Sequence, residues 1–129
     1  MPAPHAARHN DWCAFAQRWA EFLALWHQGH TPAQPELSQR FREVQAQVDA
    51  AFLTWVQQRY GGLHNLPAAQ PAMLHHIPRY LAHELCTSRS AKVALVLLDG
   101  LALDQWIVLR EVLTRQRPQM RLQEAAVLA

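Results

Sequence analysis

The sequence predicts a fold class between α+β and α/β, with a helical amino-terminal part and a β-α-β unit at the carboxyl end. Apolar residues recur at the 3.6-residue helical period through residues 10–61. An unbroken apolar run, Val93–Leu98, then leads directly into Asp99 and Gly100, which is typical of a buried strand and the turn after it. A second helical pattern and a second apolar stretch follow, in the order that gives two parallel strands joined by a right-handed crossover.

Two amphipathic helices are expected to form an antiparallel hairpin within residues 1–66. The first spans Asn10–His27 and the second begins near Pro35 and ends at Gly61 and Gly62. Their apolar stripes are Trp12, Phe15, Trp19, Phe22, Leu23 and Trp26 on the first helix, and Leu37, Phe41, Val44, Val48, Phe52 and Trp55 on the second. These rings are expected to be the core of the hairpin, and an aromatic ligand site on the same face is the alternative.

A linker and a short third helix are expected in residues 67–90. Glycines and prolines break the helical pattern over residues 61–72, and the pattern resumes at Ile77–Cys86. In that helix Leu81 and Leu85 are expected to face inward.

The start of an α/β domain is expected in residues 91–129. Strands at Lys92–Leu98 and Arg121–Leu128 flank a helix at Leu103–Arg115. Two parallel strands need cover on both faces and further neighbours, so we expect this domain to be incomplete and the chain to be truncated.

Composition narrows the functional classes. Half of the residues are apolar, which is enough for a core, and no apolar run approaches the length of a membrane span. The amino terminus lacks the apolar core of a signal peptide, so we expect a cytoplasmic protein that contacts no membrane. Cys13 and Cys86 are too few for a disulfide framework and form no CxxC pair. The basic residues are scattered, and the net charge of +2 does not indicate a nucleic-acid groove.

Asp99 is the candidate functional residue, because open α/β sheets bind ligands beyond the carboxyl ends of their strands. Several other sites that begin this way are excluded by inspection. Leu101 stands where a dehalogenase-type phosphotransfer site needs a second aspartate, and no glycine-rich lysine loop accompanies the strand. Gly100 is alone, whereas a dinucleotide-binding turn needs three spaced glycines.

The stretch Val96–Leu101, followed by Asp-Gln-Trp at residues 104–106, resembles the opening of a PglZ domain. This family is a branch of the alkaline phosphatase superfamily found in bacteriophage exclusion (BREX) defence systems. The segments at residues 73–78 and 122–129 resemble the borders of the same opening, so the resemblance covers residues 71–129. The helical hairpin is compatible with the region that such proteins carry upstream.

The resemblance implies that Asp99 is a ligand of a divalent metal, which would be zinc, manganese or magnesium. Carboxylate oxygen suits these metals, and Gly100 allows a sharp turn beside the ion. The resemblance places the serine or threonine nucleophile and the other ligands beyond Ala129, so it implies no catalytic residue in this segment and no activity by itself. The intact protein would be a metal-dependent phosphatase- or phosphodiesterase-like component of phage defence. Its partners would be a phosphorylated substrate or nucleic acid and other defence subunits.

Other interpretations of these residues stay open. Asp99 can be a turn former or a helix cap, and Asp104 can interact with the dipole of the helix that it opens. A metal site of His76, His83 and Cys86 is less favoured than structural roles, because no fourth ligand is evident. Thr114, Ser88 and Ser90 are interpreted as solvated residues, because none has an activating base beside it.

The competing functional class is a helical interaction or scaffold module without catalytic activity. Trp12, Trp19 and Trp26 recur every seven residues along one line of the first helix. Such a line can be core or a docking face for partner subunits of a defence complex.

Overall fold

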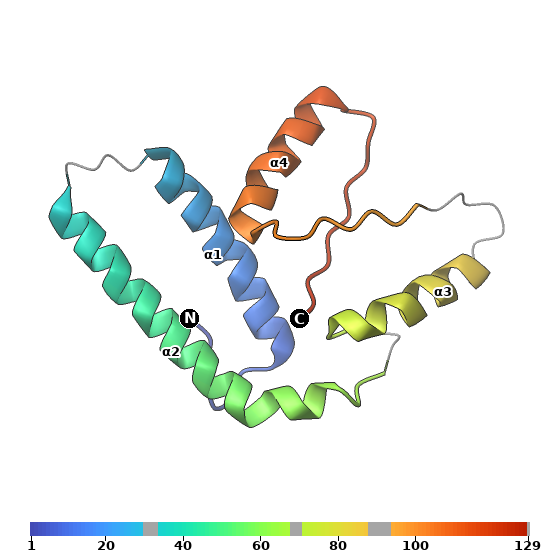
Figure 1. Ribbon diagram of the computed structural model, residues 1–129, viewed down its shortest axis with the longest axis horizontal. Helices are drawn as coiled ribbons and strands as arrows, with labels where there is room; N and C mark the ends of the chain where they lie inside the picture. Colours follow the sequence, from blue (N-terminus) through green and yellow to red (C-terminus); the bar gives the residue numbers. More distant parts are fainter. Residues whose placement is uncertain (30–33, 68–70, 88–93, 129) are drawn as a thin grey trace.

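Helices form where the sequence carries its helical apolar period. A computed structural model describes residues 1–29, 34–67, 71–87 and 94–128. Over these ranges the helices, in chain order, are α1 (His9–Gly29), α2 (Pro35–Leu63), α3 (Ile77–Thr87) and α4 (Leu103–Gln116), with one 3₁₀ turn, η1 (Leu74–His76), directly before α3 (Figure 1). The expected positions of all four helices are therefore confirmed to within a few residues, and none of these helices has the length and hydropathy to cross a bilayer.

The α1–α2 hairpin is held together by aromatic rings. The two helices run side by side in opposite directions (Figure 1). Trp26 stacks on Phe41 with ring centroids 4.4 Å apart, and Trp12 meets Phe52 edge to face at 5.1 Å. Large rings that interlock in this way contribute both buried area and a preferred geometry. The predicted antiparallel hairpin is confirmed, but the stripes form its core only in part: Trp12 and Trp55 are buried, whereas Phe22, Leu37 and Phe52 stay 42, 47 and 36% exposed.

The main hydrophobic cluster lies at the end of the hairpin where α1 begins and α2 ends. Its buried members come from the two helices and from the segment just before η1, and they are Trp12, Trp55, Leu63, Ala72 and Met73. Trp55 is the most deeply buried large side chain, and its indole Nε1 donates a 2.8 Å hydrogen bond to the carbonyl of Ala7. The amino-terminal residues are thereby attached to the hairpin.

α4 packs against α1. Ala20 and Ala24 of α1 are buried together with Ile107 of α4. Small side chains let the two helices approach closely, so that a single isoleucine fills the contact. In a β-α-β unit the crossover helix instead covers its own two strands. The apolar side of α4 that would cover two such strands packs against α1 instead.

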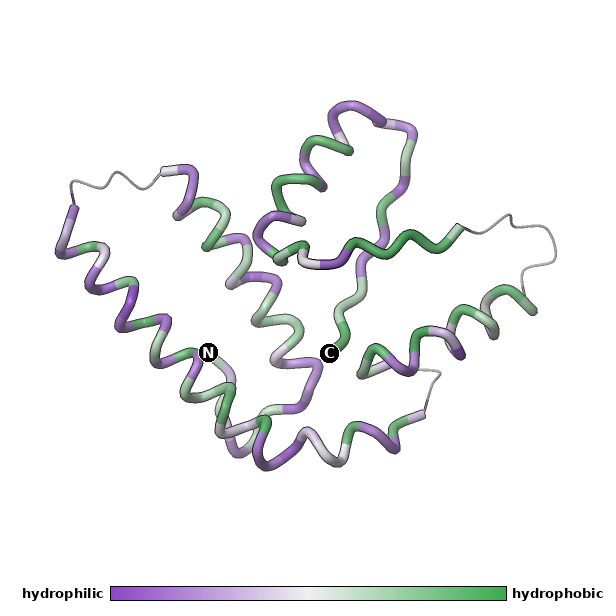
Figure 2. The backbone as a smooth tube through the Cα atoms, in the orientation of Figure 1, coloured by the Kyte–Doolittle hydropathy of each residue, from purple (hydrophilic) through white to green (hydrophobic). Residues whose placement is uncertain are grey.

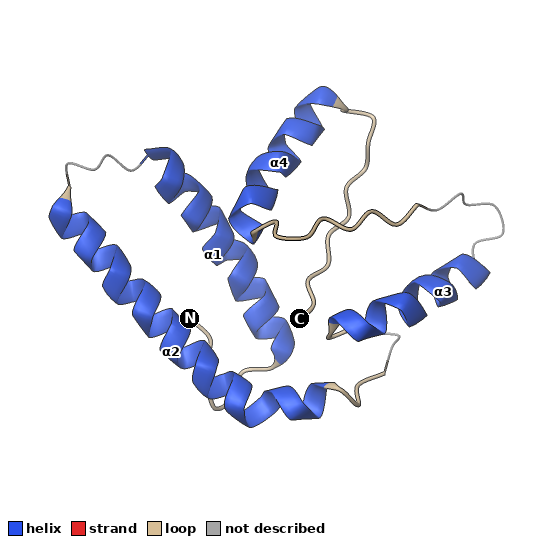
Figure 3. Cartoon of the chain, viewed as in Figure 1, coloured by secondary structure: helices blue, strands red, loops and turns tan. Residues whose placement is uncertain are grey.

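The predicted β-α-β unit is wrong, and with it the α+β to α/β fold class. The described part of the chain contains helices and loops but no strand (Figure 3). Residues 94–98 are extended, yet no backbone hydrogen bond links them to another described residue. Residues 92 and 93 of the predicted first strand lie outside the described ranges.

The second predicted strand, Arg121–Leu128, forms one isolated parallel bridge instead of a ladder. The bridge joins Leu128 to Met73: the Leu128 amide donates to the Ala72 carbonyl at 2.8 Å, and the Leu74 amide donates to the Leu128 carbonyl at 3.0 Å. Two strands cannot bury both of their faces by themselves, so the apolar side of α4 is better buried against the hairpin than against two strands. The same shortage of cover leaves Leu85 of α3 exposed, although the sequence pattern predicted it to face inward.

Candidate functional site

Asp99 lies in an exposed turn between the extended segment 94–98 and α4. Gly100 follows with φ of +71°, a left-handed conformation that glycine adopts without steric cost. The residue that caps α4 is Ala102, whose amide donates to Oε1 of Gln105 at 3.0 Å. Asp99 is therefore a turn residue, and the interpretation of Asp99 as a helix cap is wrong.

The turn at residues 99 and 100 holds one carboxylate, that of Asp99. Among the described residues, no group of three or more histidine, cysteine, aspartate or glutamate side chains is arranged to hold a metal. A tightly bound catalytic zinc has three protein ligands, so Asp99 by itself can supply only part of a site.

Asp104 lies in the first turn of α4, where its charge favours the helix dipole, as the sequence predicted. Its Oδ2 also lies 3.9 Å from Nε2 of His27, in the last turn of α1. The pair thus connects the start of α4 to the end of α1. Asp104 therefore has a structural partner, and its position does not indicate that it is a second metal ligand.

His76 is a structural residue. Its side chain is buried, and Nδ1 accepts hydrogen bonds from the amides of Ala72 at 3.2 Å and Met73 at 3.3 Å. An Nδ1 that accepts two amides is not free for a metal. His83 and Cys86 are exposed on α3, so the three-residue metal site considered from the sequence does not form.

The hydroxyl of Thr114 donates to the carbonyl of Arg110 at 2.8 Å, one helical turn earlier, which is a local helix contact and not the arrangement of a nucleophile. Ser88 and Ser90 lie outside the described residues.

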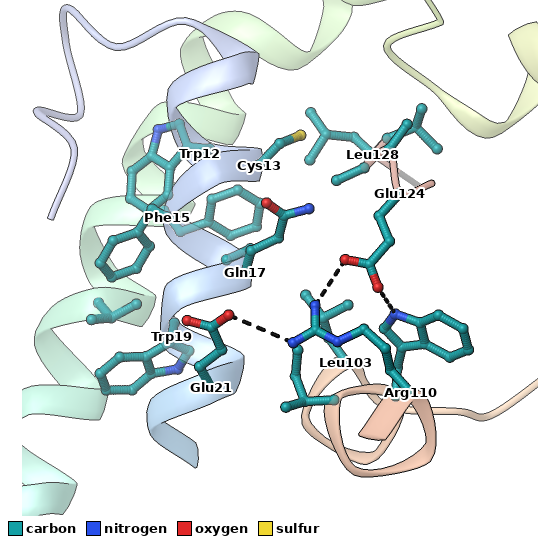
Figure 4. Close-up of a pocket in the computed structure, with 18 of the residues that line it drawn as sticks. Trp12, Cys13, Phe15, Gln17, Trp19, Glu21, Leu103, Arg110, Glu124 and Leu128 are labelled. Atoms are coloured by element: carbon teal, nitrogen blue, oxygen red, sulfur yellow. Dashed lines mark hydrogen bonds and ion pairs between the residues drawn. The ribbon is translucent and has the colours of Figure 1, made fainter. Parts of the chain in front are cut away.

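A cavity of about 510 Å³ lies between α1, α2, α4 and the carboxyl-terminal segment (Figure 4). Its apolar wall includes Trp12, Phe15 and Trp19 of α1 and Phe52 of α2. The cavity is large enough for a small ligand. An aromatic ligand site on this face was the alternative drawn from the sequence. The cavity itself could not be predicted, because it depends on how α4 and residues 124–128 sit against the hairpin.

The polar side of this cavity is an ion-pair network. Arg110 Nη1 lies 2.9 Å from Glu124 Oε2, and Arg110 Nη2 lies 3.8 Å from Glu21 Oε1. Trp106 Nε1 donates to the other oxygen of Glu124 at 2.9 Å (Figure 4). Because two carboxylates already face this guanidinium, the cavity presents no uncompensated cation for a phosphate group.

Cys13 lines the same cavity, and burial raises the pKa of its thiol above the ordinary value of 9.0. A raised thiol pKa lowers the thiolate fraction at neutral pH. The cavity therefore does not activate Cys13 as a nucleophile.

Comparison with known proteins gives no relative: no family model, no curated protein and no solved structure matches this chain.

Proposed function

We propose that this chain acts as the amino-terminal part of a PglZ-type metal-dependent phosphatase- or phosphodiesterase-like protein in phage defence. In this proposal Asp99 supplies one metal ligand, and the nucleophile and other ligands come from outside residues 1–129. The metal would be zinc, manganese or magnesium, whose shared preference for oxygen ligands a carboxylate satisfies.

The observation that carries the proposal is the exposed apolar segment that ends at Asp99. Leu95, Val96 and Leu97 are 76, 76 and 86% exposed, whereas leucine and valine in extended segments are usually buried in a sheet. Asp99 follows this segment directly, in a turn that leaves its carboxylate exposed and accessible to a metal ion. The left-handed Gly100 supports this role, because it places no side chain beside the carboxylate.

The lone carboxylate predicts how the chain behaves by itself. One exposed carboxylate loses most of its attraction for a cation to water and salt, so tight metal binding needs further ligands. We therefore expect the 129-residue chain to hydrolyse neither phosphomonoesters nor phosphodiesters and to bind zinc or manganese only weakly.

Isothermal titration of the chain with zinc and with manganese tests this. The Asp99→Ala variant is compared with Asp49→Ala, which removes an exposed carboxylate from α2. Weak binding that Asp99→Ala abolishes and Asp49→Ala leaves unchanged is the expected result. Micromolar binding that survives Asp99→Ala would show that the ligand assignment is wrong.

The function itself is tested in a phage challenge of cells that carry the native gene. We expect Asp99→Ala to abolish protection and Asp49→Ala to retain it, with both proteins present at equal levels. Full protection by the Asp99→Ala strain would show that a metal ion bound by Asp99 is not needed for the function.

A second candidate function is partner docking by the helical hairpin. It is favoured by large apolar side chains of α1 and α2 that are exposed to solvent. Leu25 is 67% exposed and Leu53 is 57% exposed. Exposed apolar surface of this kind is typical of interaction sites. Crosslinking of the native protein tests this candidate. We expect residues 10–60 to crosslink to one defined subunit, and we expect the double variant Leu25→Lys with Leu53→Lys to lose these crosslinks. The absence of any crosslink from residues 10–60 would exclude partner docking by the hairpin.

A further inference from the structure

We propose that the cavity between α1, α2, α4 and the carboxyl-terminal segment binds an organic cation, that is, an ammonium group joined to an apolar aromatic body. The volume of the cavity, about 510 Å³, is within the range of small-molecule sites. In this proposal the apolar body lies among the aromatic rings of the cavity, and the ammonium group lies at Glu21. Figure 4 shows the Glu21 carboxylate directed across the cavity toward Arg110.

Aromatic rings make the cavity suitable for the apolar body. Rings from three helices line it, namely Trp12, Phe15, Trp19, Phe52 and Trp106. The indole of Trp106 is held by its hydrogen bond to Glu124, and no other ring of the described residues stacks on it. An unstacked indole can accept a ligand ring or a cation, and indole attracts cations more strongly than the other aromatic side chains do.

The charges that line the cavity favour a cation over an anion. Arg110 is the only cationic side chain among the described residues that line it, and its guanidinium lies 2.9 Å from Glu124 and 3.8 Å from Glu21. One positive charge is thus shared by two carboxylates, and the closer contact is the one with Glu124. The charge of Glu21 is therefore only partly compensated, so it attracts a ligand cation and repels an anion.

Glu21 is also the most accessible member of the ion-pair network. Its side chain is 52% exposed, whereas the side chains of Arg110 and Glu124 are both 29% exposed. An ammonium group that binds at Glu21 keeps part of its hydration, which limits the cost of desolvation. The aromatic ligand site that the sequence left open thereby gains a specific ligand chemistry. This chemistry requires neither Asp99 nor a metal ion, so it does not depend on the function proposed above.

Three indole compounds that share a ring system but differ in charge test the ligand class. Tryptamine is a cation at neutral pH, tryptophol is uncharged, and indolepropionate is an anion. Isothermal titration of the full chain should show that tryptamine binds about tenfold more tightly than tryptophol, and that indolepropionate binds most weakly. A chain that does not bind tryptamine at millimolar concentrations, or that binds tryptamine and tryptophol equally well, would overturn the proposal.

The Glu21→Gln variant tests the position of the ammonium group. It removes the charge but keeps the length of the side chain and the Arg110–Glu124 pair, so tryptamine should bind about tenfold more weakly while tryptophol binds as before. Glu111→Gln, at an exposed position on α4 outside the cavity lining, is the control and should change neither affinity. Tryptamine affinity that is the same in Glu21→Gln as in the unchanged chain would contradict the assignment of Glu21.

The two cysteines report where the ligand binds. Cys13 lines the cavity, whereas Cys86 is exposed on α3. Saturating tryptamine should therefore slow the alkylation of Cys13 by iodoacetamide several-fold and leave that of Cys86 unchanged, as measured by mass spectrometry of peptides. This measurement needs no substitution, so it locates the ligand even if Glu21→Gln fails to fold. Slowing at both cysteines, or at neither, would mean that tryptamine binds outside the cavity and that the proposal is wrong.

Discussion

Arg110 of α4 and Glu124 of the carboxyl-terminal segment form a 2.9 Å ion pair, both side chains being 29% exposed. Trp106 donates a hydrogen bond to the same carboxylate, so two residues of α4 hold one side chain of the segment. Four residues later the segment reaches Leu128, which bridges to Met73. Glu124 thus fixes the path by which the end of the described chain returns to the hairpin.

We expect Glu124→Ala to lower the free energy of unfolding by about 1–2 kcal/mol, because it removes two hydrogen bonds to a charged, half-buried acceptor. The amides of Leu74 and Leu128, which form the bridge, should exchange faster. Urea unfolding and hydrogen exchange measure these effects. Glu111→Ala, at an exposed position on α4, is the control and should change neither. Equal effects of the two substitutions would mean that the network does not hold the segment.

His76 is expected to be the histidine on which stability depends most. His76→Ala leaves the amides of Ala72 and Met73 without their acceptor in a buried place, and each buried unpaired group costs about 1–3 kcal/mol. The loss should appear as a lower urea midpoint. His75→Ala, which removes the exposed neighbouring ring, is the matched control and should cost much less. A His76→Ala protein as stable as the His75→Ala protein would contradict this role.

The helices could be predicted from the sequence because their signals are local. The aromatic residues of α1 and α2 recur at helical spacing, and Pro35 stands at the first residue of α2, where its missing amide costs nothing. Contacts such as Trp26 with Phe41 follow once two such stripes are joined by a short connection.

The β-α-β unit was predicted wrongly because strand formation depends on neighbours that a local pattern does not reveal. The run ending at Leu98 has the composition of a buried strand, yet whether it pairs is decided by what else covers it. Ile107 is an apolar residue that a crossover helix could direct toward its strands, and in the structure it is buried with Ala20 and Ala24 instead.

The sequence singled out only Asp99 as a candidate site residue, because it follows its apolar run directly, and its role as a metal ligand stays a prediction. The Arg110–Glu124 pair joins residues separated by α4's last turn and a loop, and no spacing rule connects them. The structural role of His76 was favoured from the sequence, but its partners could not be predicted, because they are backbone amides, which every sequence contains.

The two cysteines are expected to differ in reactivity. Burial raises the pKa of the Cys13 thiol, whereas Cys86 is exposed on α3. Because the thiolate is the reactive form, iodoacetamide should modify Cys86 first, and the Cys13 rate should still be rising at pH values above 9.0. Mass spectrometry of peptides over a pH series measures both rates. In urea the two cysteines should react at similar rates. A difference in rate that persists in urea would mean that local sequence, and not burial, causes it.

Two buried tryptophans of the main cluster allow the contribution of one hydrogen bond to the free energy of unfolding to be measured. Trp55 and Trp12 are 1% and 3% exposed, and they contact each other with ring centroids 6.1 Å apart. Trp55 Nε1 donates to the Ala7 carbonyl, whereas Trp12 Nε1 is buried and has no partner among the described residues. Substitution by phenylalanine removes a similar volume from both sites but a satisfied donor from only one.

We therefore expect Trp55→Phe to be more destabilising than Trp12→Phe by about 1–2 kcal/mol, because Trp12→Phe also relieves an unsatisfied buried donor. Urea unfolding followed by circular dichroism gives both values. The amide exchange of residues 3–7 should accelerate in Trp55→Phe alone, since the Ala7 carbonyl loses its link to α2. If Trp12→Phe proved the more destabilising change, its indole nitrogen would have to have a partner, and the amino-terminal residues would have to be held by contacts other than this hydrogen bond.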